Sequence, residues 1–280
     1  MIDLSEHRKN IFQNHGLREC PHYGEDGVIL KIFEEIGISK NPFCIEFGEL
    51  RVLGTTTRSY RIFYKARSLY FSYSYDFRSF YLNIIDIFKV SFINKSFVYL
   101  KFLFNLPSSY FITTSNVEDI FKKNKVPAND LDLITVDIDS SDYYVIKQIL
   151  ELGYLPKLFI VEYNPSFGLN KKLSCPNDPE FKPTNLRLYG ASYKALDALM
   201  SKHNYSLCFV SGFSNLFYIR NDFSSRFKIP EIEDEFTDTE EKINAYIKDH
   251  CQEGFIPSWM HSPKLSETDF LLLDSLEEST

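Results

Sequence analysis

Cysteine and histidine are too sparse and too scattered in this sequence to form the usual metal or nucleophile motifs. The 280 residues include 5 cysteines, no two of which form a C-x-x-C pair, and 6 histidines. The cysteines are odd in number and far apart, which favours reduced thiols over a disulfide framework or a zinc site. No histidine belongs to an H-E-x-x-H motif or lies near a G-x-S-x-G turn, so neither a zinc protease nor a serine hydrolase is expected.

Long apolar runs and clustered positive charge are also missing. The N-terminus lacks the apolar stretch of a signal peptide, and no stretch approaches the roughly 18 uncharged apolar residues of a membrane helix. Residues 80–106 are the most apolar region, but Asp86, Lys89, Lys95 and Lys101 interrupt them. The net charge is -7, which does not favour binding to a phosphate backbone. We therefore expect a cytoplasmic protein with no membrane span and no nucleic-acid partner.

The chain does contain enough apolar material for a full core. Hydrophobic residues make up 44% of it, which argues against disorder. Aromatic residues make up 16%, a bias that is typical of Phe and Tyr replacing aliphatic residues as core and interface bulk. The stretch over residues 80–104 is compatible with a lid, a dimer surface or plain core, so a homodimer stays among the alternatives.

The spacing of apolar residues predicts alternating strands and helices. Five apolar residues between positions 28 and 36 recur at helical spacing, and Gly37 follows where a helix would end. Further helices are expected over residues 58–65, 116–124, 143–152, 192–202 and 237–250. Short apolar and β-branched runs predict strands over residues 43–48, 68–72, 111–114, 131–139, 157–164, 207–210 and 215–219.

The order of these elements predicts the fold class. Strands alternate with helices over short connections, which is typical of a mostly parallel sheet covered on both faces. Only residues 211–214 separate the last two strands, too few for a crossover helix, so this pair is expected to be antiparallel. We predict an α/β, Rossmann-like domain over residues 24–225. An N-terminal arm (1–23) would precede it, and an acidic C-terminal appendage (226–280) would follow.

Polar residues follow three of the predicted strands, at the edge where open α/β sheets bind ligands. The first strand ends in Glu46 and Gly48, and a lone glycine here is as typical of an ordinary turn as of a nucleotide-binding loop. A second strand ends in Asp137 and Asp139, with Asp142 close behind. Neighbouring carboxylates repel one another, and a bound positive group or the N-terminus of a following helix stabilises them. The sequence leaves both interpretations open.

The third polar strand end is Glu162-Tyr163-Asn164-Pro165. Glu162 and Asn164 offer oxygen ligands of the kind that Mg²⁺ prefers, beside the Asp-rich strand end. They could equally orient a substrate hydroxyl for deprotonation. The structural alternative is a turn at the end of the strand, fixed by Pro165.

Several ordered segments together resemble one known family. Residues 23–27 (YGEDG) resemble its GEDG element, 43–48 (FCIEFG) its first strand, 133–143 (LITVDIDSSDY) its SIDIDGNDY segment and 161–164 (VEYN) its IEYN segment. Residues 189–192 and 215–222 also fit. Over residues 22–222 the chain is similar to the FkbM-like branch of the S-adenosylmethionine-dependent methyltransferases. This resemblance implies the class I methyltransferase fold.

The resemblance also implies methyl transfer to a sugar or glycan-related hydroxyl, with a small molecule or a glycan as substrate. It implies that S-adenosylmethionine is held by Glu25, Asp26, Glu46, Gly48, Asp76 and Asp137. The residues expected to carry the chemistry are Asp139, Asp142 and Glu162. Mg²⁺, if the enzyme uses it, is expected on Asp139, Glu162 and Asn164.

Two segments depart from the family pattern. The first strand normally continues as FG-A-x-D-G, whereas residues 48–52 read GELRV. The acid that normally ends the second strand is missing from residues 72–76, which read SYSYD, so Asp76 would replace it only with a shift in register. A catalytically inactive binding or assembly protein of methyltransferase fold is therefore the alternative function, and a different metal-dependent transferase is a third. The carboxylates retained at two strand ends favour an enzyme.

Overall fold

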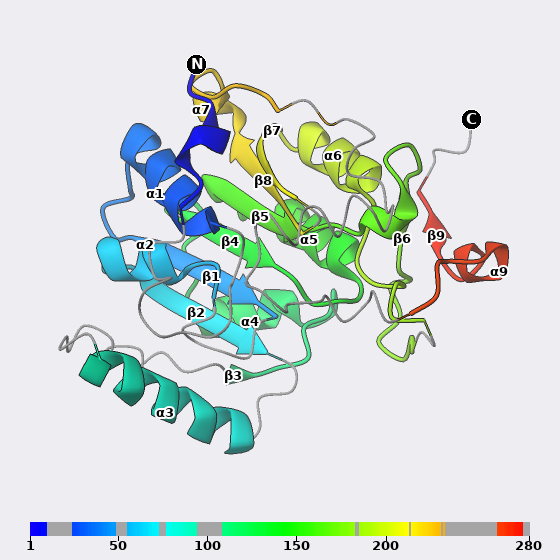
Figure 1. The fold of residues 1–280 in the computed structure, drawn as a ribbon, viewed down its shortest axis with the longest axis horizontal. Helices are drawn as coiled ribbons and strands as arrows, with labels where there is room; N and C mark the ends of the chain where they lie inside the picture. Colours follow the sequence, from blue (N-terminus) through cyan, green and yellow to red (C-terminus); the bar gives the residue numbers. More distant parts are fainter. Residues whose placement is uncertain are drawn as a thin grey trace.

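The protein is an α/β structure with helices on both faces of a central sheet (Figure 1). This computed structural model describes residues 1–9, 24–48, 55–72, 77–93, 108–182, 185–212, 214–230, 232 and 262–276. Asp76, the segment 49–54 after the first strand and the helix expected over residues 237–250 lie outside the described residues.

The central sheet has seven strands in the order β3-β2-β1-β4-β5-β8-β7. Neighbours from β3 to β5 run parallel, whereas β8 runs antiparallel to both β5 and β7. The predicted α/β class, with a mostly parallel sheet and an antiparallel pair late in the chain, is confirmed. The strands are β1 (Phe43–Phe47), β2 (Arg67–Ser72), β3 (Ser108–Ser109), β4 (Leu133–Val136), β5 (Leu158–Glu162), β7 (Tyr205–Ser211) and β8 (Asn215–Arg220).

Two buried apolar clusters fill the spaces between the sheet and its helices. On one face, α1 (Glu25–Ile36) and α2 (Arg58–Phe63) pack against residues such as Cys44 and Leu133. The opposite face is covered by α4 (Val117–Lys123), α5 (Asp142–Glu151) and α6 (Tyr193–Lys202). Alternate residues of each strand point to opposite faces, so both sides of the buried strands are apolar.

The helix predicted from apolar spacing near the N-terminus is α1. Its apolar positions are buried, and it ends at Gly37, whose φ of 75° suits glycine far better than other residues. The first residues of the expected arm pack against it, through the short 3-10 helix η1 (Leu4–His7) and the buried Leu4. Ile2 forms a parallel bridge with Phe227. The expected arm and the start of the expected appendage are thus joined by this bridge.

The strand expected over residues 111–114 is wrong. The edge strand there is β3, only two residues long, and the backbone after it turns toward α4. Asn116 explains the turn, because its side chain accepts a hydrogen bond from Thr113 N at 2.9 Å and donates one to Phe111 O at 2.7 Å. These local side-chain bonds compete with a strand ladder.

The aromatic-rich segment contributes one long helix, α3 (Phe77–Ile93), next to the β2 and β3 edge of the sheet (Figure 1). Phe80, Tyr81 and Phe88 on this helix are exposed. No helix among the described residues combines the length and apolarity that crossing a membrane requires. At the other end of the chain, β9 (Asp274–Ser275) pairs antiparallel with β6 (Leu173–Ser174), so this part of the expected appendage is docked.

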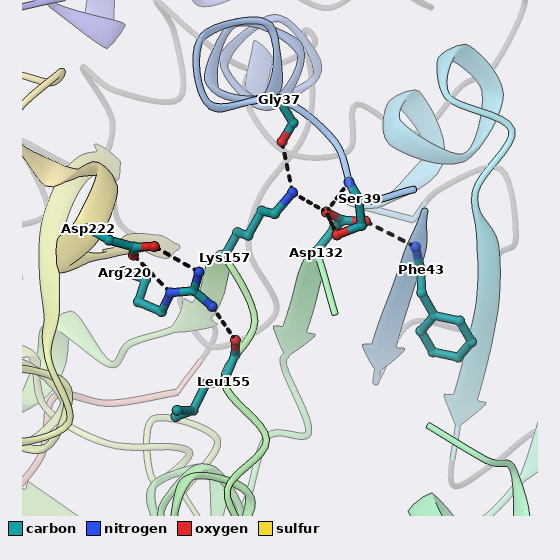
Figure 2. Close-up of polar contacts among 8 residues, drawn as sticks. All are labelled: Gly37, Ser39, Phe43, Asp132, Leu155, Lys157, Arg220 and Asp222. Carbon is teal, nitrogen blue, oxygen red and sulfur yellow. Dashed lines mark hydrogen bonds and ion pairs between the residues drawn. The ribbon is translucent and has the colours of Figure 1, made fainter. Parts of the chain in front are cut away.

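A buried carboxylate fastens the amino ends of three parallel strands (Figure 2). Asp132, just before β4, accepts hydrogen bonds from Ser39 N at 3.0 Å, Ser39 Oγ at 2.8 Å and Phe43 N at 3.2 Å. Lys157, just before β5, lies 3.0 Å from the same carboxylate and donates to Gly37 O. The α1–β1 connection is thereby tied to β4 and β5, at the edge opposite the predicted site.

Candidate functional site

The predicted site residues lie at the carboxyl ends of β1, β4 and β5. The chain order reverses between β1 and β4, because β2 and β3 lie to one side of β1 and β5 lies beyond β4. Open α/β sheets bind ligands at such a switch point. Cys44, Leu133 and Leu158 pack on the α1 face of the sheet. Side chains of a strand alternate between the two faces, so residues two or four positions later point to the same face. Glu46, Asp137 and Glu162 stand at these positions and therefore share the α1 face.

At the end of β1, Glu46 is held by the start of α2. Its carboxylate accepts hydrogen bonds from Thr56 N at 2.8 Å, Thr57 N at 3.0 Å and Thr57 Oγ1 at 2.5 Å. Burial raises the pKa of Glu46 to about 6, although these bonds favour the charged form. Glu46 therefore anchors the N-terminus of α2 to the sheet.

Gly48 allows the ends of β1 and β4 to approach each other. Its φ is +121°, and a Cβ atom at this position would lie 1.5 Å from the carbonyl oxygen of Asp137. Only glycine fits there. The structure thus gives Gly48 a role in backbone packing at the switch point.

The N-terminus of α1 adds two more buried acids. Asp26 forms an ion pair with Arg58, whose Nη2 lies 2.5 Å from Oδ2, and both side chains are nearly inaccessible. Glu25 accepts a hydrogen bond from Asn215 Nδ2 at 3.0 Å. Burial raises the pKa of Glu25 to about 8, against the opposing effects of Ser211 and Asn215. Both acids connect α1 to neighbouring elements inside the protein.

The turn after β4 is shaped by Asp142, the first residue of α5. Its carboxylate accepts hydrogen bonds from Ile138 N and Ser140 N, each at 2.9 Å. Burial raises the pKa of Asp142 to about 6. The residue between these two donors, Asp139, has a φ of 54°, a left-handed conformation that Asp tolerates better than most residues. Asp142 is thus a positioning residue that fixes the turn carrying Asp139.

Three acids meet at the end of this turn. Asp137, Asp139 and Glu162 each offer a carboxylate oxygen, and these oxygens lie within 4.8 Å of one another. Burial, followed by repulsion from Asp137 and Asp139, holds the pKa of Glu162 well above its usual range. Asp139 keeps the most accessible surface of the three, yet surrounding protein atoms still raise the pKa of its carboxyl group. The cluster can share protons or accommodate a positive charge.

Asn164 and Tyr189 complete the wall beside Glu162. Asn164 is fully buried; its Nδ2 donates to the carbonyls of Arg187 and Tyr189, both at 2.8 Å, and its Oδ1 accepts from Ser166 N. Tyr189 is 5% exposed, and its hydroxyl has no hydrogen-bond partner among the described residues. Burial, followed by the charge of Glu162, raises the pKa of Tyr189 well above its usual range. The hydroxyl therefore stays protonated and can donate a hydrogen bond.

Sequence reasoning placed the acids at the correct edge but missed three side chains there. Arg58 pairs with Asp26, Asn215 bonds Glu25, and Tyr189 faces the acidic cluster. Asn215 begins β8, which pairs antiparallel with β5, and Glu162 is its register partner. The sequence predicted only that β8 runs antiparallel to β7, so the β5–β8 pairing that brings Asn215 to this edge had no signal of its own.

Comparison with known proteins gives no family assignment. No protein-family model matches this chain, and no curated protein matches its sequence.

Proposed function

We propose that this protein is an S-adenosylmethionine-dependent O-methyltransferase that acts on a sugar or glycan-related hydroxyl. The observation that carries the proposal is the cluster of Asp137, Asp139 and Glu162 beside the switch point of a parallel sheet closed by an antiparallel pair. That sheet shape is also the shape of class I methyltransferases. The ordered resemblance of six sequence segments, two of which contain these acids, also supports the proposal.

The residues at the switch point divide into those that can face a cofactor and those that support the framework. S-adenosylmethionine carries a positive sulfonium and an ammonium group, which an acidic strand end complements. Asp137, on the α1 face at the end of β4, would hold the cofactor. Glu46, Asp26 and Glu25 bond side chains or backbone groups of the protein and support the walls. When bound, the cofactor would supply an electrophilic methyl group.

Glu162 would accept the proton of the acceptor hydroxyl. An oxygen nucleophile must lose its proton during methyl transfer, and a general base works best when its pKa lies near the operating pH. Burial and the neighbouring carboxylates raise the pKa of Glu162 from the usual range of a carboxyl group. Asp139, on the same turn, would orient the hydroxyl, and Asp142 would position Asp139.

Calorimetric titration with S-adenosylhomocysteine and S-adenosylmethionine, with and without Mg²⁺, tests the proposal. We expect micromolar affinity for the wild type and for Glu118→Gln, an exposed carboxylate on α4 that serves as the control. Asp137→Asn should bind at least about tenfold more weakly, a change of about 1.4 kcal/mol. Absence of binding to the wild type at millimolar ligand would contradict the proposal.

One observation favours the alternative, an inactive protein of the same fold that serves in binding or assembly. The carboxylate of Glu46 and the backbone of Gly48 are both used inside the protein, at the position where a cofactor loop is expected to begin. The same titration separates the two functions, because an inactive relative that has lost the cofactor gives no binding heat.

A further inference from the structure

The buried hydroxyl of Tyr189 points to a ligand at the acidic cluster. Tyr189 is 5% exposed, and its oxygen has no hydrogen-bond partner among the described residues. The strongest charge interactions of this side chain are with Glu162 and Asp139. A buried hydroxyl without a partner destabilises the folded protein unless something binds there. The atom therefore adds an observation that is independent of the acids themselves.

One carboxylate oxygen of the cluster also lacks a hydrogen-bond donor among the residues that the structure describes. Glu162 Oε2 is buried without a hydrogen-bond donor in the described part of the chain. Its largest charge interactions are with three other acids, Asp137, Asp139 and Asp142. Like charges at this separation repel, and a bound cation reverses that repulsion into attraction.

We propose that Asp137, Asp139 and Glu162 form a binding site for a hard divalent cation such as Mg²⁺, Mn²⁺ or Ca²⁺. All three ligand atoms are carboxylate oxygens, the donor type that these ions prefer over softer metals. These oxygens lie within 4.8 Å of one another, and oxygens bound to one Ca²⁺ are at most about 4.6–5.2 Å apart. The smaller Mg²⁺, with metal–oxygen bonds of about 2.0–2.1 Å, holds its ligand oxygens closer together than Ca²⁺ does.

Three protein ligands leave coordination positions for water or substrate. Mg²⁺ usually keeps several waters beside one or two carboxylates. Tyr189 can supply the hydrogen bond that such a water or hydroxyl needs, because its buried hydroxyl has no other partner among the described residues. Asn164 acts as a positioning residue, because its amide holds the backbone carbonyl of Tyr189 at 2.8 Å. The sequence had suggested Asn164 as a ligand; this proposal gives the third position to Asp137 instead.

The cation site goes beyond the proposed function and stands without it. If methyl transfer is correct, Glu162 would act as a ligand of the ion instead of as a free base, and the ion would polarise the acceptor hydroxyl and assist its deprotonation. If it is wrong, the same ligands still bind the ion and serve a different reaction. The test below therefore contains no S-adenosylmethionine, so its failure is distinguishable from failure of the methyltransferase proposal.

Electron paramagnetic resonance of Mn²⁺ tests the site, because binding removes the signal of the free ion. We expect one Mn²⁺ per chain for the wild type and for the surface control Glu118→Gln. Glu162→Gln and Asp139→Asn should weaken binding by about tenfold or more, since even partners outside the ligand set cost 10- to 100-fold. Tyr189→Phe should weaken it less than either. Absence of binding by the wild type, or equal binding by the wild type and Glu162→Gln, would overturn the proposal.

Thermal unfolding of the same proteins guards against a variant that fails to fold. Without metal, Glu162→Gln and Asp139→Asn should melt at or above the wild-type temperature, because each removes a repelling carboxylate. Mn²⁺, at a concentration that saturates the wild type, should raise the melting temperature of the wild type and of Glu118→Gln more than that of either acid variant. Equal stabilisation of all four proteins by Mn²⁺ would place the ion elsewhere.

Discussion

Replacing Asp132 with alanine should destabilise the protein severely although it lies far from the candidate site. The carboxylate is completely buried and accepts hydrogen bonds from Ser39 N, Ser39 Oγ and Phe43 N, in addition to its ion pair with Lys157 (Figure 2). The substitution leaves these donors without their acceptor and leaves the Lys157 ammonium, 16% exposed, without its counter-ion. Removing one partner of such a pair costs about 3–5 kcal/mol. That loss is a large share of an ordinary free energy of unfolding.

Urea denaturation measures the loss, and the same figure offers a matched control. Asp222 pairs with Arg220 at 2.8 Å, but its side chain is 51% exposed. Asp222→Ala should therefore cost less than about 1 kcal/mol, and Arg220 keeps its bond to Leu155 O. If Asp132→Ala loses less than Asp222→Ala, burial does not determine the value of these carboxylates and the reasoning is refuted.

Three further substitutions test the walls of the site by urea denaturation. Burial raises the pKa of Glu25 from 4.5 to about 8, so the folded protein keeps a proton that the unfolded chain loses, and wild-type stability should fall as pH rises between these values. Glu25→Gln should remove about 2 kcal/mol of the fall between about pH 6 and 8, and an unchanged pH profile would contradict this. Asp26→Ala, which breaks the buried pair with Arg58, should cost about 3 kcal/mol or more, and a loss below 1 kcal/mol would show that the pair is dispensable. Gly48→Ala, which directs a Cβ at Asp137 O, should cost about 3 kcal/mol or more, and a neutral effect would show that the strand ends can move apart.

Much of the fold could be predicted because its signals are local. The apolar spacing of α1 and its end at Gly37 need no knowledge of the rest of the chain. The short connection at residues 211–214 was enough to predict that β7 and β8 are antiparallel. By contrast, β3 and β6 are two residues long and exist only because distant segments pair with them. The β-propensity of two residues is too weak a signal to predict such strands from the sequence.

The candidate site was partly predictable for the same reason. Acids at the ends of parallel strands must meet at one edge, so the grouping of Asp137, Asp139 and Glu162 follows from the order of elements. Tyr189 lies between β5 and α6, where no periodicity fixes the chain, and the amide of Asn164 brings it to the cluster. An interaction of that kind depends on tertiary structure, which the sequence pattern does not carry.

A crystal structure of the protein grown with S-adenosylhomocysteine tests the central claim most directly. The proposed function predicts density for the ligand beyond the carboxyl ends of β1 and β4, in contact with Asp137. Density at another place on the molecule, or crystals that exclude the ligand at millimolar concentration, would contradict it.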